Sequence, residues 1–277
     1  MQTQDKEAAQ ISSPVGEEAA RRAGQPLVSG DGEGAAPLQH LALIMDGSGR
    51  WAAQRSLARS VGHEAGAETA RRVVRWARQR EIPHLSLFAF SSLNWGRPSE
   101  EVSALMRLLE RFLLEEEEQL IEEGIRLRAI GERSYLPAPL RALLERVEER
   151  SAGGNALQLT IAVSYDGRRD VVQAARRLVE LARRGELLPA DVTEPQLFSC
   201  LSTAQLPDVD LLIRTSGERR LSGFLPLETC YAELSFNDKL WPDLTTGDLE
   251  EELEAYLERQ RRFGLTGAQL EQRGSLT

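Results

Sequence analysis

The chain has 277 residues, of which 41% are hydrophobic and 28% are charged. This composition excludes collagen-like, coiled-coil and fully disordered chains, and it supplies enough apolar side chains for a sizeable core. The formal net charge of −9 argues against a general nucleic-acid binder, which is usually basic.

The two ends of the chain differ in composition from its middle. Residues 1–37 are polar and interrupted by glycine and proline, which predicts a disordered N-terminal tail. We expect one domain over 38–265 and a short C-terminal tail over 266–277. No apolar run reaches the roughly 18–20 residues of a transmembrane helix, and the polar N-terminus is not a secretory signal. Cys200 and Cys230 lack metal-ligand spacing, so we expect reduced thiols in a cytoplasmic protein.

Apolar runs and helical periodicity alternate from residue 38 onward. The runs predict strands at 41–45, 85–90, 125–130, 157–163 and 209–213, with a further apolar segment at 234–236. The periodicity predicts helices at 64–80, 99–123, 137–150, 170–184, 194–201 and 247–262. The alternation predicts a single-domain α/β fold whose central, mostly parallel sheet is flanked by helices. Ligands of such sheets bind beyond the carboxyl ends of strands.

The first strand-end segment contains Asp46, Gly47, Ser48, Gly49, Arg50 and Trp51. Two glycines let backbone N–H groups converge on an anion, and Arg50 adds a fork of donors. Asp46 is placed to hold a divalent cation that bridges a phosphate. Taken alone, this segment is explained more simply by a plain turn with a capping aspartate. Arg59 and His63 follow, and His63 can donate to a phosphate or simply cap the next helix.

The second segment follows the strand at 85–90 and contains Ser91, Ser92, Leu93, Asn94, Trp95 and Arg97. Asn94 can orient a water molecule or a substrate proton, and Arg97 can neutralise phosphate charge. A polar loop with an aromatic plug is the alternative.

The third segment concentrates positive charge after the strand at 209–213. It contains Arg214, Arg219 and Arg220 together with several hydroxyl groups, and it continues through Leu221 to Ser222. In an acidic protein this pattern favours an anion site over a solvated basic loop. Glu233 adds a carboxylate that could share a metal ion.

We expect the other charged groups and the remaining histidines to have structural roles only. The run 115–118 is four glutamates, which cannot share one helix face, so we expect a solvated surface. Glu100 and Glu101 begin a helix and favour its macrodipole. His40 and His84 are expected to be structural.

Several motifs in one order resemble the cis-prenyltransferase family. They span residues 40–264 and comprise His40–Ala52, Gly62–His63, Phe88–Pro98, Tyr165–Arg168, Asp210–Glu218, Tyr231–Leu234, Leu240–Asp243 and Arg261–Gly264. The resemblance implies that an allylic diphosphate, such as farnesyl diphosphate, loses its diphosphate and is attacked by isopentenyl diphosphate. A proton then leaves to give a cis double bond. The expected product is an undecaprenyl-type lipid carrier.

The resemblance also implies a role for each matching residue. Asp46 would hold Mg²⁺ and act in catalysis, and Glu233 would be a second metal ligand. Asn94 would take part in proton abstraction. The substrate diphosphates and chains would contact Gly47, Ser48, Gly49, Arg50, Trp51, Arg59, His63, Ser91, Ser92, Leu93, Trp95, Arg97, Arg214, Arg220, Leu221 and Ser222.

Further properties follow from the same resemblance. Members are homodimers in which a C-terminal motif, here Arg262–Gly264, reaches the partner's site. The growing chain needs an apolar tunnel, which the strands at 85–90 and 157–163 and the helix at 99–123 can line, and the small side chain of Ala89 would leave it open. The lipid product suggests peripheral contact with the inner face of the membrane.

The chain departs from the family pattern at several positions. Ser48 replaces Asn, Leu93 replaces Glu, Ser216 replaces Gly, and Ser164 and Asp166 replace the Asn and first Gly of Asn-Tyr-Gly-Gly. Gly223 replaces Asn, and Pro226–Leu227 replaces Leu-Trp. These changes leave two alternatives, a short-chain or irregular prenyl diphosphate synthase and a non-catalytic partner subunit. The retained aspartate, asparagine and arginines argue against the second.

Overall fold

The structure is a computed structural model that describes residues 37–259. Most of the predicted N-terminal tail, the C-terminal tail and the Arg262–Gly264 motif lie outside the described residues. The described residues form two compact units, one made of 37–171 with 206–259 and the other of 172–205.

The larger unit is built on a six-stranded sheet. In the order β3-β4-β2-β1-β5-β6, every neighbouring pair is parallel, and this confirms the predicted α/β fold. The strands are β1 (His40–Ile44), β2 (His84–Ser91), β3 (Ile125–Ile130), β4 (Leu157–Tyr165), β5 (Leu211–Arg214) and β6 (Glu233–Phe236). The short apolar segment at 234–236 is thus an edge strand.

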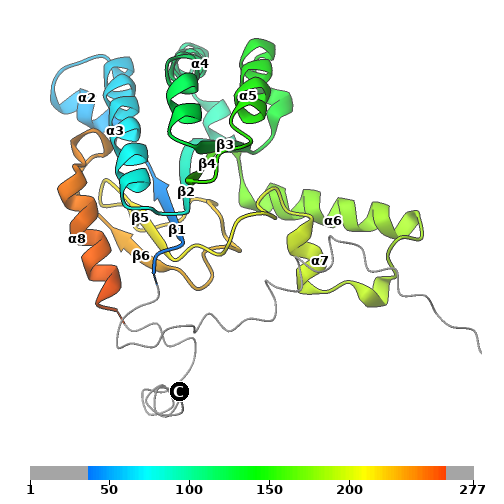
Figure 1. The fold of residues 1–277 in the computed structure, drawn as a ribbon. Coiled ribbons are helices and arrows are strands. Elements are labelled where there is room, and N and C mark those ends of the chain that lie inside the picture. The colour runs from blue at the N-terminus through cyan, green and yellow to red at the C-terminus, as the bar shows by residue number, and fades with distance from the viewer. Residues whose placement is uncertain (1–36, 260–277) are drawn as a thin grey trace, which may run out of the picture. The chain divides into compact units, whose positions relative to one another are not determined.

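Helices connect the strands. The larger unit contains α2 (Ser48–Gln54), α3 (Arg59–Gln79), α4 (Ser99–Glu122), α5 (Ala138–Arg150) and α8 (Thr246–Leu257), with 3₁₀ turns η1 (Ser92–Gly96), η2 (Arg133–Tyr135) and η4 (Trp241–Asp243). Figure 1 shows α3, α4 and α5 on one side of the sheet, with α8 packed beside α3. None of the helices within 37–259 is long and apolar enough to cross a membrane.

The smaller unit is helical. Helix α6 (Gly167–Arg183) begins in the larger unit and continues into the smaller one, which also holds η3 (Pro189–Asp191) and α7 (Glu194–Ser199). Within it, Arg177 Nη1 donates a 2.6 Å hydrogen bond to the carbonyl of Cys200, tying α6 to the end of α7.

The central strand β1 is buried on both of its faces. Leu41 and Leu43 belong to the core formed with the helices, whereas Ala42 and Ile44 belong to a second core completed by Phe224. Alternate side chains of a strand point to opposite faces, and parallel strands covered on both faces read as continuous apolar runs. This is why the run 41–45 predicted a buried strand.

Helix α2 was not predicted, because the glycines at 47 and 49 suggested a turn. Gly47 caps the helix with a φ of 111°, and the helix begins at the next residue. Gly62 explains how closely α3 approaches α2, since a Cβ there would lie 2.1 Å from the Ser48 carbonyl oxygen.

The pairing of β2 with β4 is irregular near the carboxyl ends of both strands. Phe88 pairs with Ala162 and Phe90 with Val163, which leaves Ala89 without a cross-strand partner. Ser91 then pairs with Tyr165, which leaves Ser164 unpaired on β4. Ser164 has a φ of 55°. Such bulges redirect side chains at the ends of sheets.

The expectation that the glutamates at 115–118 are a solvated surface is wrong for two of them. Glu117 is only 5% exposed and accepts hydrogen bonds from Arg146 of α5, while Glu116 accepts from Arg71 of α3 at 2.6 Å. Successive helical residues point about 100° apart, so a run of four reaches both neighbouring helices as well as solvent.

Candidate functional site

An ion pair between two adjacent strand ends forms the centre of the site. Ile44 pairs with Arg214 across β1 and β5, so Asp46 emerges beside the Arg214 side chain. Arg214 is 4% exposed, and its Nη2 donates a 2.8 Å hydrogen bond to Asp46 Oδ2. Burial raises the pKa of Asp46, but the hydrogen bond and charge of Arg214 outweigh it and hold this pKa below its usual value.

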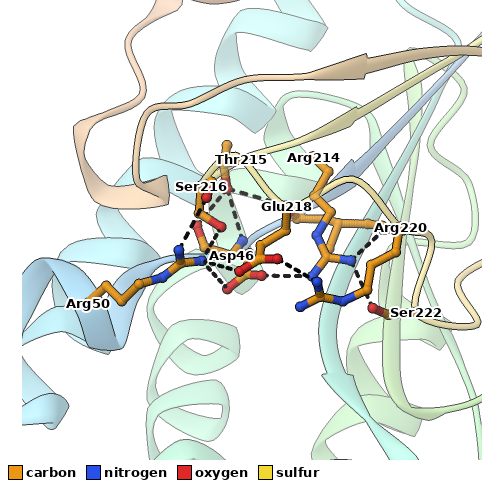
Figure 2. Close-up of polar contacts among 9 residues, drawn as sticks. Asp46, Arg50, Arg214, Thr215, Ser216, Glu218, Arg220 and Ser222 are labelled. Atoms are coloured by element: carbon orange, nitrogen blue, oxygen red, sulfur yellow. Dashed lines mark hydrogen bonds and ion pairs between the residues drawn. The ribbon is translucent and has the colours of Figure 1, made fainter.

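Polar contacts fix the loop that follows β5 (Figure 2). Arg214 Nη1 donates to the Arg220 carbonyl and, at 2.8 Å, to Ser222 Oγ. The Thr215 hydroxyl accepts from the Asp46 backbone N–H at 3.0 Å and lies 2.7 Å from the Asp46 carbonyl oxygen. Arg214 and Thr215 therefore hold both the side chain and the backbone of Asp46.

Arg50 reaches the same cluster from α2. Its guanidinium donates to Ser216 Oγ at 2.6 Å and to the Ser216 carbonyl at 3.2 Å. It also lies 3.4 Å from Glu218 and 3.7 Å from Asp46, and Glu218 in turn binds Arg220. Arg50, Arg214 and Arg220 thus converge on one place, as the motifs predicted.

A second basic cluster surrounds Glu101 at the start of α4. Its Oε1 lies 3.1 Å from Arg59 Nε, 3.0 Å from Arg97 Nη1 and 3.7 Å from His63 Nε2. Burial lowers the pKa of His63 and the two arginines add to this, while Glu101 opposes it. From its place at the start of a helix, Glu101 was expected only to favour the macrodipole, although its four-residue spacing from Arg97 was a usable signal.

The turn η1 carries Asn94. Asn94 Oδ1 accepts from the Ser91 N–H at 3.0 Å, and Ser91 Oγ accepts from the Leu93 N–H at 3.2 Å, in a capping box. Leu93 is 76% exposed. Ser92 and Trp95 instead turn toward β4, where they bond Asp166 and Ser164.

An apolar cavity of about 140 Å³ lies between the sheet and helices α3 and α4. Ser48 and His63 are among its lining residues, so it adjoins the basic clusters. Its other walls are Met45, Gly66, Ala67, Ala70, Leu87, Ala89, Phe90, Leu105, Met106, Leu108, Leu109, Phe112, Ile161 and Trp241. Ala89, Ile161 and α4 line it as predicted, whereas the contribution of α3 was missed.

Two buried side-chain nitrogens in these clusters have no hydrogen-bond partner among the described residues. They are Arg214 Nε, which is a donor, and His63 Nε2, which lies 3.7 Å from Glu101 Oε1. An unsatisfied buried donor costs about 1–3 kcal/mol, and an oxyanion bound here would relieve that cost. The chemistry of the site is therefore anion binding beside an apolar cavity.

Two predicted residues have side chains that pack outside the arginine cluster. Trp51 Nε1 donates to Asp243 at 2.6 Å, and its ring is covered by Arg55. Leu221 packs on the second core, next to Phe224.

Glu233 does not join Asp46 within one chain. Its register partner is Leu211, which pairs with Leu41 at the start of β1. At a rise of about 3.3 Å per residue, Asp46 lies roughly 15 Å further along the sheet. Glu233 bonds Arg259 instead, at 3.0 Å. Within 37–259, no three His, Cys, Asp or Glu residues cluster as a metal site would.

The chain is similar to one described family over most of its length. Residues 44–264 match the family described as "Putative undecaprenyl diphosphate synthase". A relative from Xanthomonas axonopodis pv. citri, named ditrans,polycis-undecaprenyl-diphosphate synthase ((2E,6E)-farnesyl-diphosphate specific), is 45% identical over 85% of this chain and 92% of its own. An isoprenyl transferase from Chromobacterium violaceum is 44% identical over 86% and 92%.

Two solved structures share the fold. Lavandulyl diphosphate synthase from Lavandula x intermedia, in complex with dimethylallyl diphosphate, has a TM-score of 0.80 and 35% identity, covering 82% of this chain and 98% of its own. A probable undecaprenyl diphosphate synthase from Campylobacter jejuni has a TM-score of 0.70 and 34% identity, covering 83% and 100%.

Proposed function

The chain belongs to the undecaprenyl diphosphate synthase family, and from this premise we propose that it adds isopentenyl diphosphate to farnesyl diphosphate at the carboxyl edge of its sheet. The C–O bond to the allylic diphosphate breaks, and the double bond of isopentenyl diphosphate attacks the carbon left behind. A new C–C bond forms, and a proton leaves to give a cis double bond. Repetition gives a long-chain product of the undecaprenyl type.

One observation supports placing this reaction at the candidate site. The arginines and the unpaired buried N–H of Arg214 Nε gather beside an apolar cavity. A prenyl diphosphate matches this arrangement, because it has an anionic head and an apolar tail. We assign the allylic diphosphate to Gly47, Ser48, Gly49, Arg50, Arg59 and His63, and isopentenyl diphosphate to Arg214, Arg220 and Ser222.

The residues present fit a bound Mg²⁺. Mg²⁺ is usually held by one or two carboxylates together with substrate phosphates, and Asp46 is a half-buried carboxylate with a lowered pKa. Asp46 would hold the ion together with the substrate diphosphate, and the ion would supply charge stabilisation to the leaving group. Glu233 lies at the amino ends of the strands, whereas Asp46 lies beyond their carboxyl ends. Its predicted metal role is therefore not assigned to the ion bound by the same chain.

The chain's own groups perform the remaining tasks. The guanidinium groups of Arg50 and Arg97 stabilise the charge that develops on the departing diphosphate. The hydrogen bond from Ser91 fixes the Asn94 amide, which we assign to the proton that leaves isopentenyl diphosphate. The cavity receives the apolar chain and excludes water from the reacting carbons.

Two further properties remain part of the proposal. We expect a homodimer, and the molecular mass measured by sedimentation equilibrium tests this. We also expect the protein to act in the cytoplasm, at the inner face of the membrane, because its product is a lipid; co-sedimentation with anionic vesicles tests this contact.

The decisive experiment is incubation with radiolabelled isopentenyl diphosphate and a panel of allylic primers. Chromatography of the dephosphorylated products then gives their length and branching. Long linear products from farnesyl diphosphate support the proposal. A branched or short product would instead favour the irregular or short-chain alternative, and no product from any primer would contradict catalysis.

A further inference from the structure

Two side chains at the end of β4 tether the turn that carries Asn94. We propose that Ser164 and Asp166 are positioning residues for η1, and that they hold the Asn94 amide in its reactive place. This inference rests on the proposed function, because it concerns the same reaction.

Ser164 is directed toward η1 by the bulge in β4. It is 2% exposed and lacks a cross-strand partner, and its Oγ lies 2.9 Å from Trp95 Nε1, which donates to it. Its φ of 55° lies in the left-handed region, which is uncommon for a serine. Backbone strain of this kind persists where the surrounding structure requires it, and it gathers at functional sites.

Asp166 makes a second connection, to the first residue of η1. Its Oδ2 accepts from Ser92 Oγ at 3.3 Å, while its Oδ1 accepts from the Arg168 N–H at 2.9 Å. The same carboxylate therefore joins η1 to the first turn of α6. Because Asn94 lies between Ser92 and Trp95, both ends of the peptide that carries its amide are fixed to β4.

The remaining contacts of η1 do not define its position as closely. The Asn94 and Ser91 side chains accept hydrogen bonds from backbone N–H groups within the same capping box. The Trp95 ring packs against Phe90 and Tyr135, at 5.0 and 6.2 Å between centroids, and apolar contacts are less directional than hydrogen bonds. A displacement of about 1 Å can reduce turnover about 100-fold, so the directional hydrogen bonds have a catalytic consequence.

A double-mutant cycle tests the first tether in the full-length protein. Ser164→Ala should lower kcat about tenfold, because one hydrogen bond is worth about 1.4 kcal/mol, with both KM values nearly unchanged. In a Trp95→Phe background, which lacks the indole N–H, Ser164→Ala should cause no further loss. Ser164→Asn, which accepts the same bond and tolerates positive φ, should restore kcat.

The second tether is tested by comparing two variants at one position. Asp166→Ala removes the partner of Ser92 and should lower kcat. Asp166→Asn keeps a hydrogen-bonding group and a helix cap, so it should retain most of kcat.

The matched control is Ser151→Ala. Ser151 is also 2% exposed and accepts from the Leu127 N–H at 3.0 Å, on the edge strand β3. This variant should lower Tm without changing kcat. The inference is overturned if Ser164→Ala behaves in the same way, or if its effect and that of Trp95→Phe multiply in the double mutant. Absence of turnover in the unmodified protein would contradict the proposed function instead.

Discussion

At the scale of single residues, the site depends on Asp46 and its buried partner Arg214. Asp46→Asn removes the charge that balances a guanidinium only 4% exposed, and it removes the proposed metal ligand. We expect kcat to fall at least about 100-fold. Turnover within a few-fold of the original would exclude Asp46 from the reaction.

The effect of Asp46→Asn on the free energy of unfolding should depend on pH. The pKa of Asp46 is lowered by folding from an unfolded value of about 3.9. Its contribution to stability is therefore complete above that value and is lost as the pH falls through the folded-state pKa. The difference in unfolding free energy between the original protein and Asp46→Asn, measured with urea, should be largest near neutral pH and should shrink below about pH 4. A difference that grows on acidification would contradict the ion pair.

Arg214 distinguishes the two substrate sites. Arg214→Ala should raise the KM for isopentenyl diphosphate about tenfold or more, well above its effect on the allylic KM. Steady-state kinetics with each substrate varied in turn measure this split. Arg80→Ala, which removes a half-exposed guanidinium bound to Glu250, is the control and should change neither value. Equal effects of Arg214→Ala on both substrates would mean that the two sites are assigned wrongly.

At the scale of elements, ion pairs join α4 to its neighbours on each side. Glu117→Gln should lower the unfolding free energy by about 1 kcal/mol, a value reduced for the solvent exposure of Arg146 and Arg150. Glu118→Gln is the matched control, because Glu118 is 71% exposed. Thermal melts of the two variants at neutral pH measure the difference, and equal melting temperatures would contradict a structural role for Glu117.

The shifted pKa of Glu117 also predicts how its contribution to stability changes with pH. Hydrogen bonds from Arg146 lower it most, burial raises it, and Arg150 lowers it further. Since the net shift is downward, the stability that Glu117 provides is present above its unfolded pKa and disappears as acid protonates the folded carboxyl group.

Some elements could be predicted from sequence and others could not. The apolar run at 41–45 and the periodicity of 99–123 act within a few residues, so both elements were predicted. Helix α2 was missed because Gly47 and Gly49 disfavour helix on their own, whereas in the fold Gly47 is a cap and Gly49 leaves space for the Arg59 side chain.

At the scale of the whole molecule, we expect the apolar cavity to limit how long a prenyl chain can grow. Phe112 lines both the large cavity and a second void of about 10 Å³. On its other side the Arg71 guanidinium lies 5.3 Å from the ring. Phe112 therefore closes the apolar cavity against a charged cluster.

Substitutions in this wall should change product length in opposite directions. Phe112→Ala joins the two voids and should lengthen the products, whereas Ala89→Leu narrows the cavity and should shorten them. Leu114→Ala is the control, because Leu114 is 53% exposed on the same helix. Chromatography of dephosphorylated products measures the lengths, and unchanged lengths in both cavity variants would show that the chain grows elsewhere.

Local sequence determined the alternation of strands and helices, the strand ends at which ligands would bind, and the arginines that gather there. These features depend on side-chain period and on glycine and arginine chemistry, which act over short stretches of chain. Only the tertiary structure decided that Glu101 lies beside His63 and that Ser164 reaches Trp95. It also decided that Glu233 lies at the amino ends of the strands, far from Asp46 at the carboxyl end of β1. Those outcomes follow from strand register and helix packing, which join residues too distant in sequence for any local pattern to connect.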